Sequence, residues 1–342
     1  MDPIYAGMRS GLLIVRGDRA DAPADVVDGS TSTVTLEDHD LECVSAHPNE
    51  PERAFVGTFD DGLFRTTDAG RTWQRIGDGV IAHESVTAVA IEPDRPAVVW
   101  AGTEPSRLYR STDGGDTWQA VEGLTDLPSE PEWSFPPRPH THHVRWIEPD
   151  PGTAGRLYVG IEAGALVLVE DDGDRFVDRP EGSRRDNHTL ATHPDAPERV
   201  YSAAGDGFAL STDAGSSWKS PQEGLDHRYV WGLGVDPGDP DTVIVSAASG
   251  ARTAHTAERA EAYCYRRRGT GGWERLDGTG LPVGEGVTRH VLTGGGDPGV
   301  LYALSNAGLY RTADSGDTWT RVDVDWPDRF DAETGRGIAV PF

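Results

Sequence analysis

Short segments in which apolar and polar residues alternate make up most of the chain, and most of these segments end near a proline or glycine. In residues 86–91, for example, a mostly apolar run leads into the turn at Pro93, and two further short apolar segments follow at 98–102 and 107–110. Alternation with a period of two predicts β-strands, because successive side chains of a strand point to opposite faces. Few stretches have the helical period, so we predict an all-β fold.

The strand that opens each group of strands, here called the inner strand, recurs seven times along the chain. The predicted inner strands are residues 41–46, 86–91, 142–147, 187–192, 230–235, 287–292 and 337–340. No further strands follow the last one, but residues 4–7 and 11–15 at the N-terminus have the pattern of its missing partners. We therefore predict seven four-stranded antiparallel sheets of about 49 residues each, closed into a ring by both chain ends. Residues 1–342 are predicted to form a single domain.

A seven-residue motif follows the third strand of most groups. It reads Thr-Asp-Ala-Gly-Arg-Thr-Trp at 67–73, and close copies occur at 112–118, 212–218 and 313–319. Weaker copies occur at 170–176 and 267–273. An aspartate carboxylate can accept backbone N–H groups in a tight turn, and glycine can adopt the positive φ that such turns need. The motif is therefore predicted to close the turn to the fourth strand, with its tryptophan packed between neighbouring sheets.

These copies of Ser/Thr-x-Asp-x-Gly-x-Thr-Trp resemble the Asp-box (BNR) repeat, and the chain resembles the β-propellers of the WD40/YVTN/BNR-like superfamily. The resemblance implies a seven-bladed β-propeller in which the boxes are structural. Asp-box propellers include the sialidases, sortilin and a photosystem assembly propeller, so it implies either glycosyl hydrolase-like chemistry or protein binding. The Arg-Ile-Pro motif of the sialidases is absent here, and sialidases have six blades, so sialidase activity itself is not expected.

The negative net charge of the chain limits the classes of molecule that it is expected to bind. It has 57 acidic and 31 basic residues, a net charge of −26, and Lys219 is its only lysine. This excess would repel nucleic-acid phosphates and anionic membranes, so neither is an expected partner. The acidity and the preference for arginine resemble halophilic proteins of haloarchaeal type. There is no signal-peptide pattern, membrane-length apolar run or disulfide framework, so we expect a cytoplasmic protein.

Propellers gather the loops that precede the inner strands on one face, here called the top face, together with the loops between second and third strands. Counting back from the proline that ends each inner strand places Glu42, Thr87, His143, His188 and Trp231 at equivalent positions around a central cavity, and Arg289 joins them. Residues 249–262, inserted in blade six, are predicted to form a short helical lid over it. A concave pocket with a few convergent polar groups is the default ligand site.

The residues that fall on the top face predict how such a ligand would be held. Arginine binds carboxylate or phosphate through a bidentate fork, and aromatic rings stack on flat sugar faces. The candidate ligand-binding residues are Glu42, Arg145, Arg228, Tyr229, Trp231, Arg252, His255 and Arg289. Carboxylates and imidazoles can act as acids and bases, and the candidate catalytic residues are His143, Glu162, Asp186 and His188.

Three functions remain open from these residues. The leading one is binding of a small anionic or carbohydrate-like ligand, with or without glycosyl hydrolase-like catalysis. The second is a non-catalytic propeller that binds or assembles proteins. The third is a hydrolase or lyase that uses a divalent metal held by His140, His142, His143 and His188, since His-x-His on a strand puts two imidazoles on one face. No other cofactor is expected.

Overall fold

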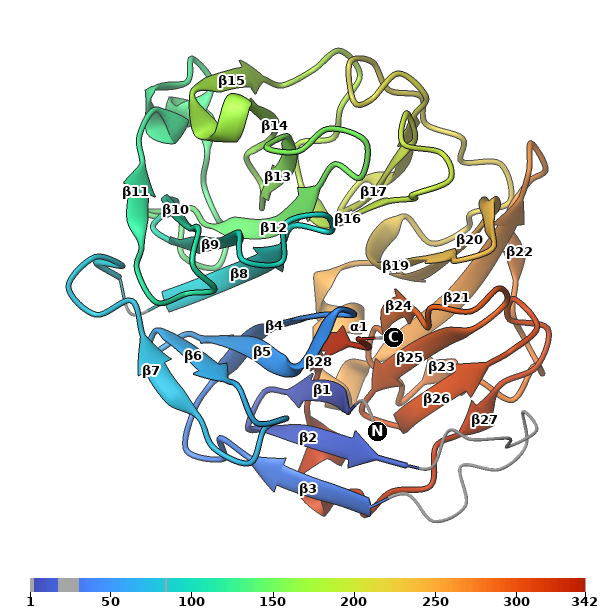
Figure 1. Ribbon diagram of the computed structural model, residues 1–342. Helices are drawn as coiled ribbons and strands as arrows, with labels where there is room; N and C mark the ends of the chain where they lie inside the picture. The colour runs from blue at the N-terminus through green and yellow to red at the C-terminus, as the bar shows by residue number, and fades with distance from the viewer. Residues whose placement is uncertain (1–2, 18–30, 84, 342) are drawn as a thin grey trace.

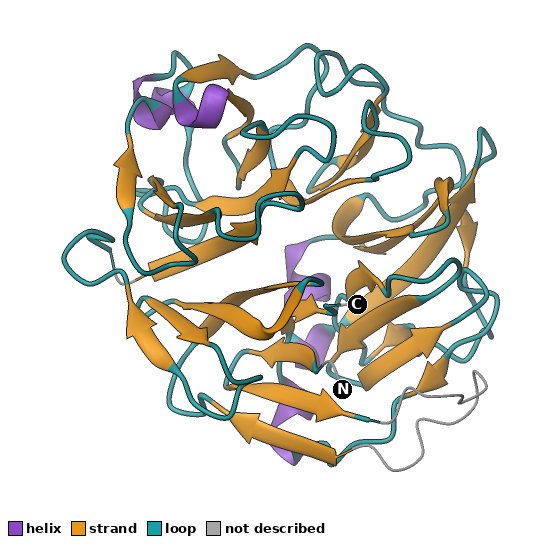
Figure 2. Cartoon of the chain, viewed as in Figure 1, coloured by secondary structure: helices purple, strands orange, loops and turns teal. Residues whose placement is uncertain are grey.

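The computed structural model describes residues 3–17, 31–83 and 85–341. They form seven antiparallel sheets arranged around a central axis as a β-propeller (Figure 1). Helix is confined to one five-residue α-helix and five short 3₁₀ turns among these residues (Figure 2). The predicted all-β, seven-bladed propeller is confirmed. None of the described helices has the length and hydrophobicity needed to span a lipid bilayer.

Six of the seven blades run from the inner strand outward in chain order, and the seventh combines the two chain ends. The first complete blade in the chain contains β4 (Leu41–His47), β5 (Glu50–Thr58), β6 (Leu63–Thr66) and β7 (Gln74–Ile76). The second contains β8 (Ser85–Ile91), β9 (Val99–Glu104), β10 (Leu108–Ser111) and β11 (Gln119–Val121). The third contains β12 (Val144–Pro149), β13 (Leu157–Ile161), β14 (Ala165–Glu170) and β15 (Arg175–Asp178). The fourth contains three strands, β16 (Asn187–Thr192), β17 (Val200–Ala204) and β18 (Gly207–Ser211). A single bridge between Leu210 and Lys219 stands where β16–β18 would have a fourth strand.

The remaining blades include an insertion and the chain ends. Blade six, counted with the blade that contains the N-terminal strands as the first, contains β19 (Tyr229–Asp236), β20 (Asp239–Ala248), β21 (Glu261–Arg268), β22 (Glu274–Arg275) and β23 (Gly284–Glu285), with α1 (Ala251–His255) between β20 and β21. It is followed by β24 (Val291–Gly294), β25 (Leu301–Ser305), β26 (Gly308–Thr312) and β27 (Thr320–Arg321). The last blade is β28 (Gly335–Ala339) with β1 (Ile4–Met8), β2 (Gly11–Arg16) and β3 (Thr31–Thr35). The 3₁₀ turns are Leu124–Asp126, Glu130–Glu132, Asp171–Gly173, Ala257–Arg259 and Asp328–Ala332.

The two ends of the chain close the ring. Strand β28 pairs antiparallel with β1, with Tyr5 opposite Ala339 and Gly7 opposite Gly337. It also contacts the inner strands on both sides, β24 and β4, so the seven inner strands form an unbroken circle around the axis (Figure 1). The ring therefore consists of seven separate sheets, and their short inner edge strands are protected by packing against the neighbouring blades.

The hydrophobic core lies between successive blades, and the box tryptophans help to fill it. Trp118 packs with Phe55 of the preceding blade, and Trp218 packs with Tyr158 in the same way. Both indole rings are almost fully buried. The tryptophans therefore lie between sheets and tie each blade to the one before it.

All four intact boxes have the same hydrogen bonds around their aspartate. In the box at 112–118, the Asp113 carboxylate accepts from the backbone N–H of Thr117 at 2.8 Å and from its hydroxyl at 2.6 Å. These bonds hold the pKa of Asp113 down at about 2. The hydroxyl of buried Ser111 donates to Asp113 and accepts from the backbone N–H of Gly115, both at 2.8 Å. Asp68, Asp213 and Asp314 have equivalent partners.

Replacing Ser111 with alanine should therefore destabilise the propeller by about 1–2 kcal/mol, because the buried N–H of Gly115 would lose its partner. Urea denaturation measures the change in unfolding free energy. Thr112→Ala is the matched control, since Thr112 is exposed in the same turn. Equal unfolding free energies for the two variants would show that the box hydroxyl does not stabilise the fold.

Candidate functional site

Six inner strands carry one extra residue near the top of the ring. In β4, Leu41 pairs with Thr58 and Cys43 pairs with Gly57, so Glu42 has no partner residue in β5. The same one-residue bulge occurs at Thr87, Arg145, His188, Trp231 and Arg336. A bulge bends its strand and re-aims the extra side chain, and bulges are frequent beside functional sites. Together the six bulges gather polar and aromatic side chains around one stretch of the axis.

The prediction that placed His143 in this ring is wrong by two residues, and Arg145 holds the position instead. Strand β12 continues through Pro149, which pairs with Leu157, so the proline that ends this inner strand is Pro151. Arg145 lies six residues before Pro151, just as Glu42 lies six residues before Pro48.

Arg336 is a site residue that sequence reasoning missed. The predicted inner strand begins at Gly337, whereas β28 begins at Gly335 and has its bulge at Arg336. Arg289 was expected in the ring, but it precedes β24, in which no bulge is present, and its side chain is fully buried.

A cavity of about 920 Å³ opens above this ring on the top face. The predicted residues that line it are Glu42, His143, Arg145, Glu162, Asp186, Tyr229, Trp231, Arg252 and His255. Arg252 and His255 belong to α1, so the inserted segment forms part of the wall. His188 and Arg289 lie buried behind the wall, and Arg228 is exposed and is not among the lining residues.

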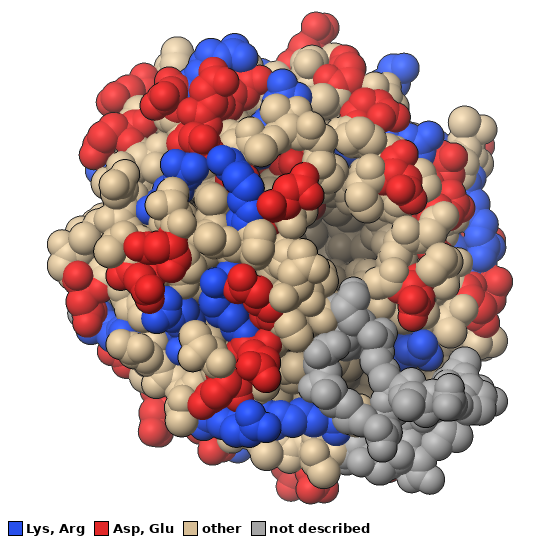
Figure 3. All heavy atoms as spheres, viewed as in Figure 1, with Lys and Arg blue, Asp and Glu red and all other residues tan. Residues whose placement is uncertain are grey.

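A second cavity of about 460 Å³ continues along the axis on the other side of the ring. Glu42, Thr87, Arg145 and Arg336 line both cavities and so separate them. In Figure 3 the centre of the molecule is hollowed, whereas acidic side chains are spread over the outer surface. The bulge residues therefore form the floor of the upper cavity.

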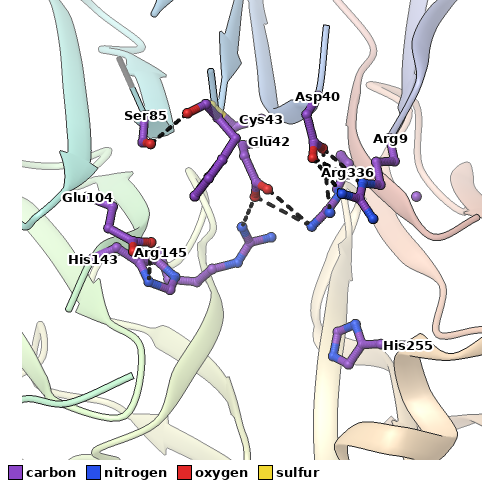
Figure 4. Close-up of polar contacts among 12 residues, drawn as sticks. Arg9, Asp40, Glu42, Cys43, Ser85, Glu104, His143, Arg145, His255 and Arg336 are labelled. Carbon is purple, nitrogen blue, oxygen red and sulfur yellow. Dashed lines mark hydrogen bonds and ion pairs between the residues drawn. The ribbon is translucent and has the colours of Figure 1, made fainter. Parts of the chain in front are cut away.

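Two arginines share one carboxylate at this floor. Glu42 lies 3.6 Å from Arg145 and 3.4 Å from Arg336, so neither ion pair is tight (Figure 4). By contrast, Arg138 at the cavity rim donates to Glu104 at 2.7 Å and Arg9 donates to Asp40 at 2.7 Å. The Nε atoms of Arg145 and Arg336 are buried and have no hydrogen-bond partner among the described residues. The guanidinium groups of Arg145 and Arg336 are therefore not fully paired by acceptors of the protein itself.

Trp231 is the packing centre of one side of the cavity. The guanidinium of Arg289 lies 4.0 Å from its ring centroid, that of Arg145 lies 4.9 Å away, and His188 stacks on the ring at 4.2 Å. Only 6% of Trp231 is exposed. These neighbours occupy the surface that a sugar would need, so of the two predicted stacking residues the half-buried Tyr229 is the more available one.

Arg289 and His255 form a buried polar link under the cavity. Arg289 donates from Nε to Nδ1 of His255 at 3.1 Å and from a terminal nitrogen to the Gly335 carbonyl at 2.9 Å. Burial, together with the charge of Arg289, holds the pKa of His255 well below its usual value. His255 is therefore neutral, and its Nε2 hydrogen points to the Tyr229 hydroxyl 3.1 Å away.

Two carboxylates on the opposite wall have pKa values shifted in opposite directions. Burial alone would raise the pKa of Glu162, but the hydrogen bond from His143 at 3.0 Å and the nearby positive groups lower it. Burial raises the pKa of Asp186. Carboxyl groups separated in this way can serve as a base and an acid in one reaction.

The four-histidine metal site that we considered is not assembled. His140 is exposed, and His142 faces Ser106 and Glu130, which are 2.9 and 3.3 Å away. Within the described ranges, two other groups have the residue types and spacing to hold a cation. They are Glu162, Asp186 and His188, and His39, Asp60 and Asp61.

Comparisons with known proteins agree with the repeat and the fold. The BNR/Asp-box repeat model matches residues 109–120. No curated protein matches the sequence. Many solved structures resemble the fold, and the three described below are less than 25% identical to this chain in sequence, so the likeness shows the fold alone.

Three of these solved structures show the range of similar propellers. An ancestral GH74 enzyme has a TM-score of 0.64 and 18% identity, covering 84% of this chain and 39% of its own. The GH74 enzyme of Niastella koreensis has a TM-score of 0.61 and 18% identity, covering 85% and 47%. YCF48 bound to a D1 peptide has a TM-score of 0.58 and 17% identity, covering 82% of each chain. This chain thus spans less than half the length of the two GH74 enzymes.

Proposed function

We propose that this BNR-repeat propeller binds a small ligand carrying a carboxylate or similar anionic group in its upper cavity. Arg145 and Arg336 would hold the anion at the cavity floor. The observation that carries this proposal is their loose, shared pairing with the single carboxylate of Glu42, at 3.6 and 3.4 Å, on the floor of a cavity that both arginines line. An unsatisfied buried donor is costly, and a planar anion supplies the paired acceptors that guanidinium groups prefer.

The surroundings of these arginines fit the same proposal. Arg252 is exposed on α1 at the cavity wall, where its charge would attract an anion despite the acidic outer surface. Tyr229 offers a partly open ring for the remainder of a sugar-like ligand. In the metal-free protein, hydrolase or lyase chemistry on that ligand would fall to Glu162 and Asp186, which line the cavity beside Arg145.

Calorimetric titration with citrate and glucuronate tests the proposal, with glucose as the neutral comparison. We expect the wild-type protein to bind at least one of the two anions and not glucose. Arg145→Gln and Arg336→Gln should each weaken binding by about tenfold to a hundredfold, because each removes a charge-assisted contact worth about 1.5–3 kcal/mol. Arg289 is unsuitable for this test, because its replacement would leave a hole beneath Trp231.

Arg71→Gln is the control, since Arg71 is an exposed arginine in a box turn away from the cavity. It should bind the anions as the wild type does. Equal binding by the Arg145 and Arg336 variants, or no binding of either anion by the wild type, would contradict the proposal.

A second candidate function is protein or peptide binding in an assembly role. One observation favours it: YCF48, described as bound to a D1 peptide, matches this chain over 82% of both lengths, whereas the GH74 enzymes are more than twice as long as the matched part. If this second function is the correct one, the Arg145→Gln variant should still bind the protein partner, and the protein should have no affinity for free citrate.

A further inference from the structure

We propose that Glu162, Asp186 and His188 form a binding site for a divalent transition-metal cation in the wall of the upper cavity. Glu162 directly follows β13, Asp186 directly precedes β16, and His188 is the bulge residue of β16. One potential ligand atom from each lies within 4.8 Å of the others. Two adjacent blades thus bring two carboxylates and one imidazole to a single point.

The hydrogen bonding of His188 fixes which nitrogen faces this point. Its Nδ1 lies 2.7 Å from the Val230 carbonyl oxygen, which can only accept, so Nδ1 carries the hydrogen. Nε2 therefore presents a lone pair, and it is buried without a hydrogen-bond partner among the described residues. It lies 3.6 Å from a carboxylate oxygen of Asp186. A lone pair that faces a carboxylate is repulsive unless a cation or a proton lies between them.

This arrangement matches the usual surroundings of a metal-bound histidine. Such histidines donate their other ring hydrogen to a carbonyl or carboxylate, as His188 does to Val230. The carboxylates are also held from behind, Glu162 by His143 at 3.0 Å and Asp186 by the backbone N–H of Ala163 at 2.8 Å. Two negative charges and one neutral imidazole balance a divalent cation.

The spacing needs only a small closure around the ion. Bonds of about 2.1 Å place tetrahedral ligands about 3.4 Å apart, compared with the present limit of 4.8 Å. Asp186 is the most exposed of the three side chains and can move inward. Glu162 and Asp186 border the cavity, so the remaining coordination positions would open to a ligand or water. Mixed imidazole and carboxylate ligands suit Zn²⁺ or Mn²⁺.

The metal site does not depend on the proposed anion binding. Arg145 lies 4.0 Å from Glu162 and repels a cation there, so Arg145→Gln should keep or strengthen metal binding while it weakens anion binding. The two proposals can therefore fail separately. The competing occupant of the space between Asp186 and His188 is a shared proton, which would leave the protein without affinity for metal.

Titration of EDTA-treated protein with MnCl₂ and with ZnCl₂, followed by calorimetry and by Mn²⁺ electron paramagnetic resonance, tests the inference. We expect one equivalent of metal to bind. Asp186→Asn, which keeps the side-chain shape, should weaken it by about a hundredfold or more. Asp61→Asn, in the second group with His39, is the matched control and should bind as the wild type does.

Glu162→Gln serves as a second variant in case Asp186→Asn does not fold, and it should also lose the metal. Absence of binding at millimolar metal in the wild type would overturn the inference in favour of the shared proton. Binding that survives in both site variants, or that disappears in Asp61→Asn, would assign the metal to another place and overturn it as well.

Discussion

Truncation of the chain before Gly335 should abolish cooperative folding of the propeller. The truncated protein would lose β28, which pairs with β1 and lies between β24 and β4 in the circle of inner strands. Two hydrophobic clusters, one shared with β25 and one with β5, would be opened, because Ile338 and Ala339 belong to them. Domains are stable by only about 5–15 kcal/mol, so this loss is expected to leave an unfolded or aggregated protein.

Circular dichroism during heating and size-exclusion chromatography measure the effect. The matched control is a circular permutant in which a short glycine linker joins residue 341 to residue 3 and the chain is opened in the turn between β21 and β22, at Thr270 and Gly271. The linker can be short because Tyr5 and Ala339 are paired. The permutant should melt as one cooperative monomer. A truncated protein that did the same would show that closure by the chain ends is dispensable.

The sequence predicted the architecture well because the architecture is repeated. The box around Asp113 has the same partners as the box around Asp314, so each copy reinforces the interpretation of the others. The alternating inner strands and the unmatched strand at each chain end were enough to predict how the ring closes. The repeated pattern is local in the sequence, so the same strand and turn signals recur from blade to blade and one irregular copy does not hide them.

The candidate site was harder to predict because its residues are set by single departures from the repeat. A bulge changes which side chain faces the axis, and only the pairing partner in the next strand reveals it, as at Arg145. The covering of Trp231 by Arg289 joins two blades through side chains distant in sequence. The loose sharing of Glu42 by Arg145 and Arg336 depends on distances that no spacing rule supplies. All three features depend on the packing of residues that are distant in the sequence, and they determine which side chains can contact a ligand.

Gly232→Ala is expected to be the most damaging single methyl addition at the ring of inner strands. Gly232 follows the bulge residue Trp231 in β19, where the strand passes close to the start of β24. A Cβ built on Gly232 would lie 2.1 Å from the carbonyl oxygen of His290. That oxygen is backbone and cannot rotate away, so two inner strands would have to separate, and Trp231 would shift with them.

We expect Gly232→Ala to lower the unfolding free energy by about 3 kcal/mol, the upper range for an overpacked core. Urea denaturation measures it, and the same variant should lose affinity for citrate if the position of Trp231 orders the cavity floor beside Arg145. Gly250→Ala is the matched control, because its added Cβ would meet no atom within 4 Å, and it should change stability by less than about 0.5 kcal/mol. If both variants unfold at the same urea concentration, the close approach of β19 to β24 does not constrain the ring of inner strands. In that case this approach cannot be what fixes the positions of the bulges.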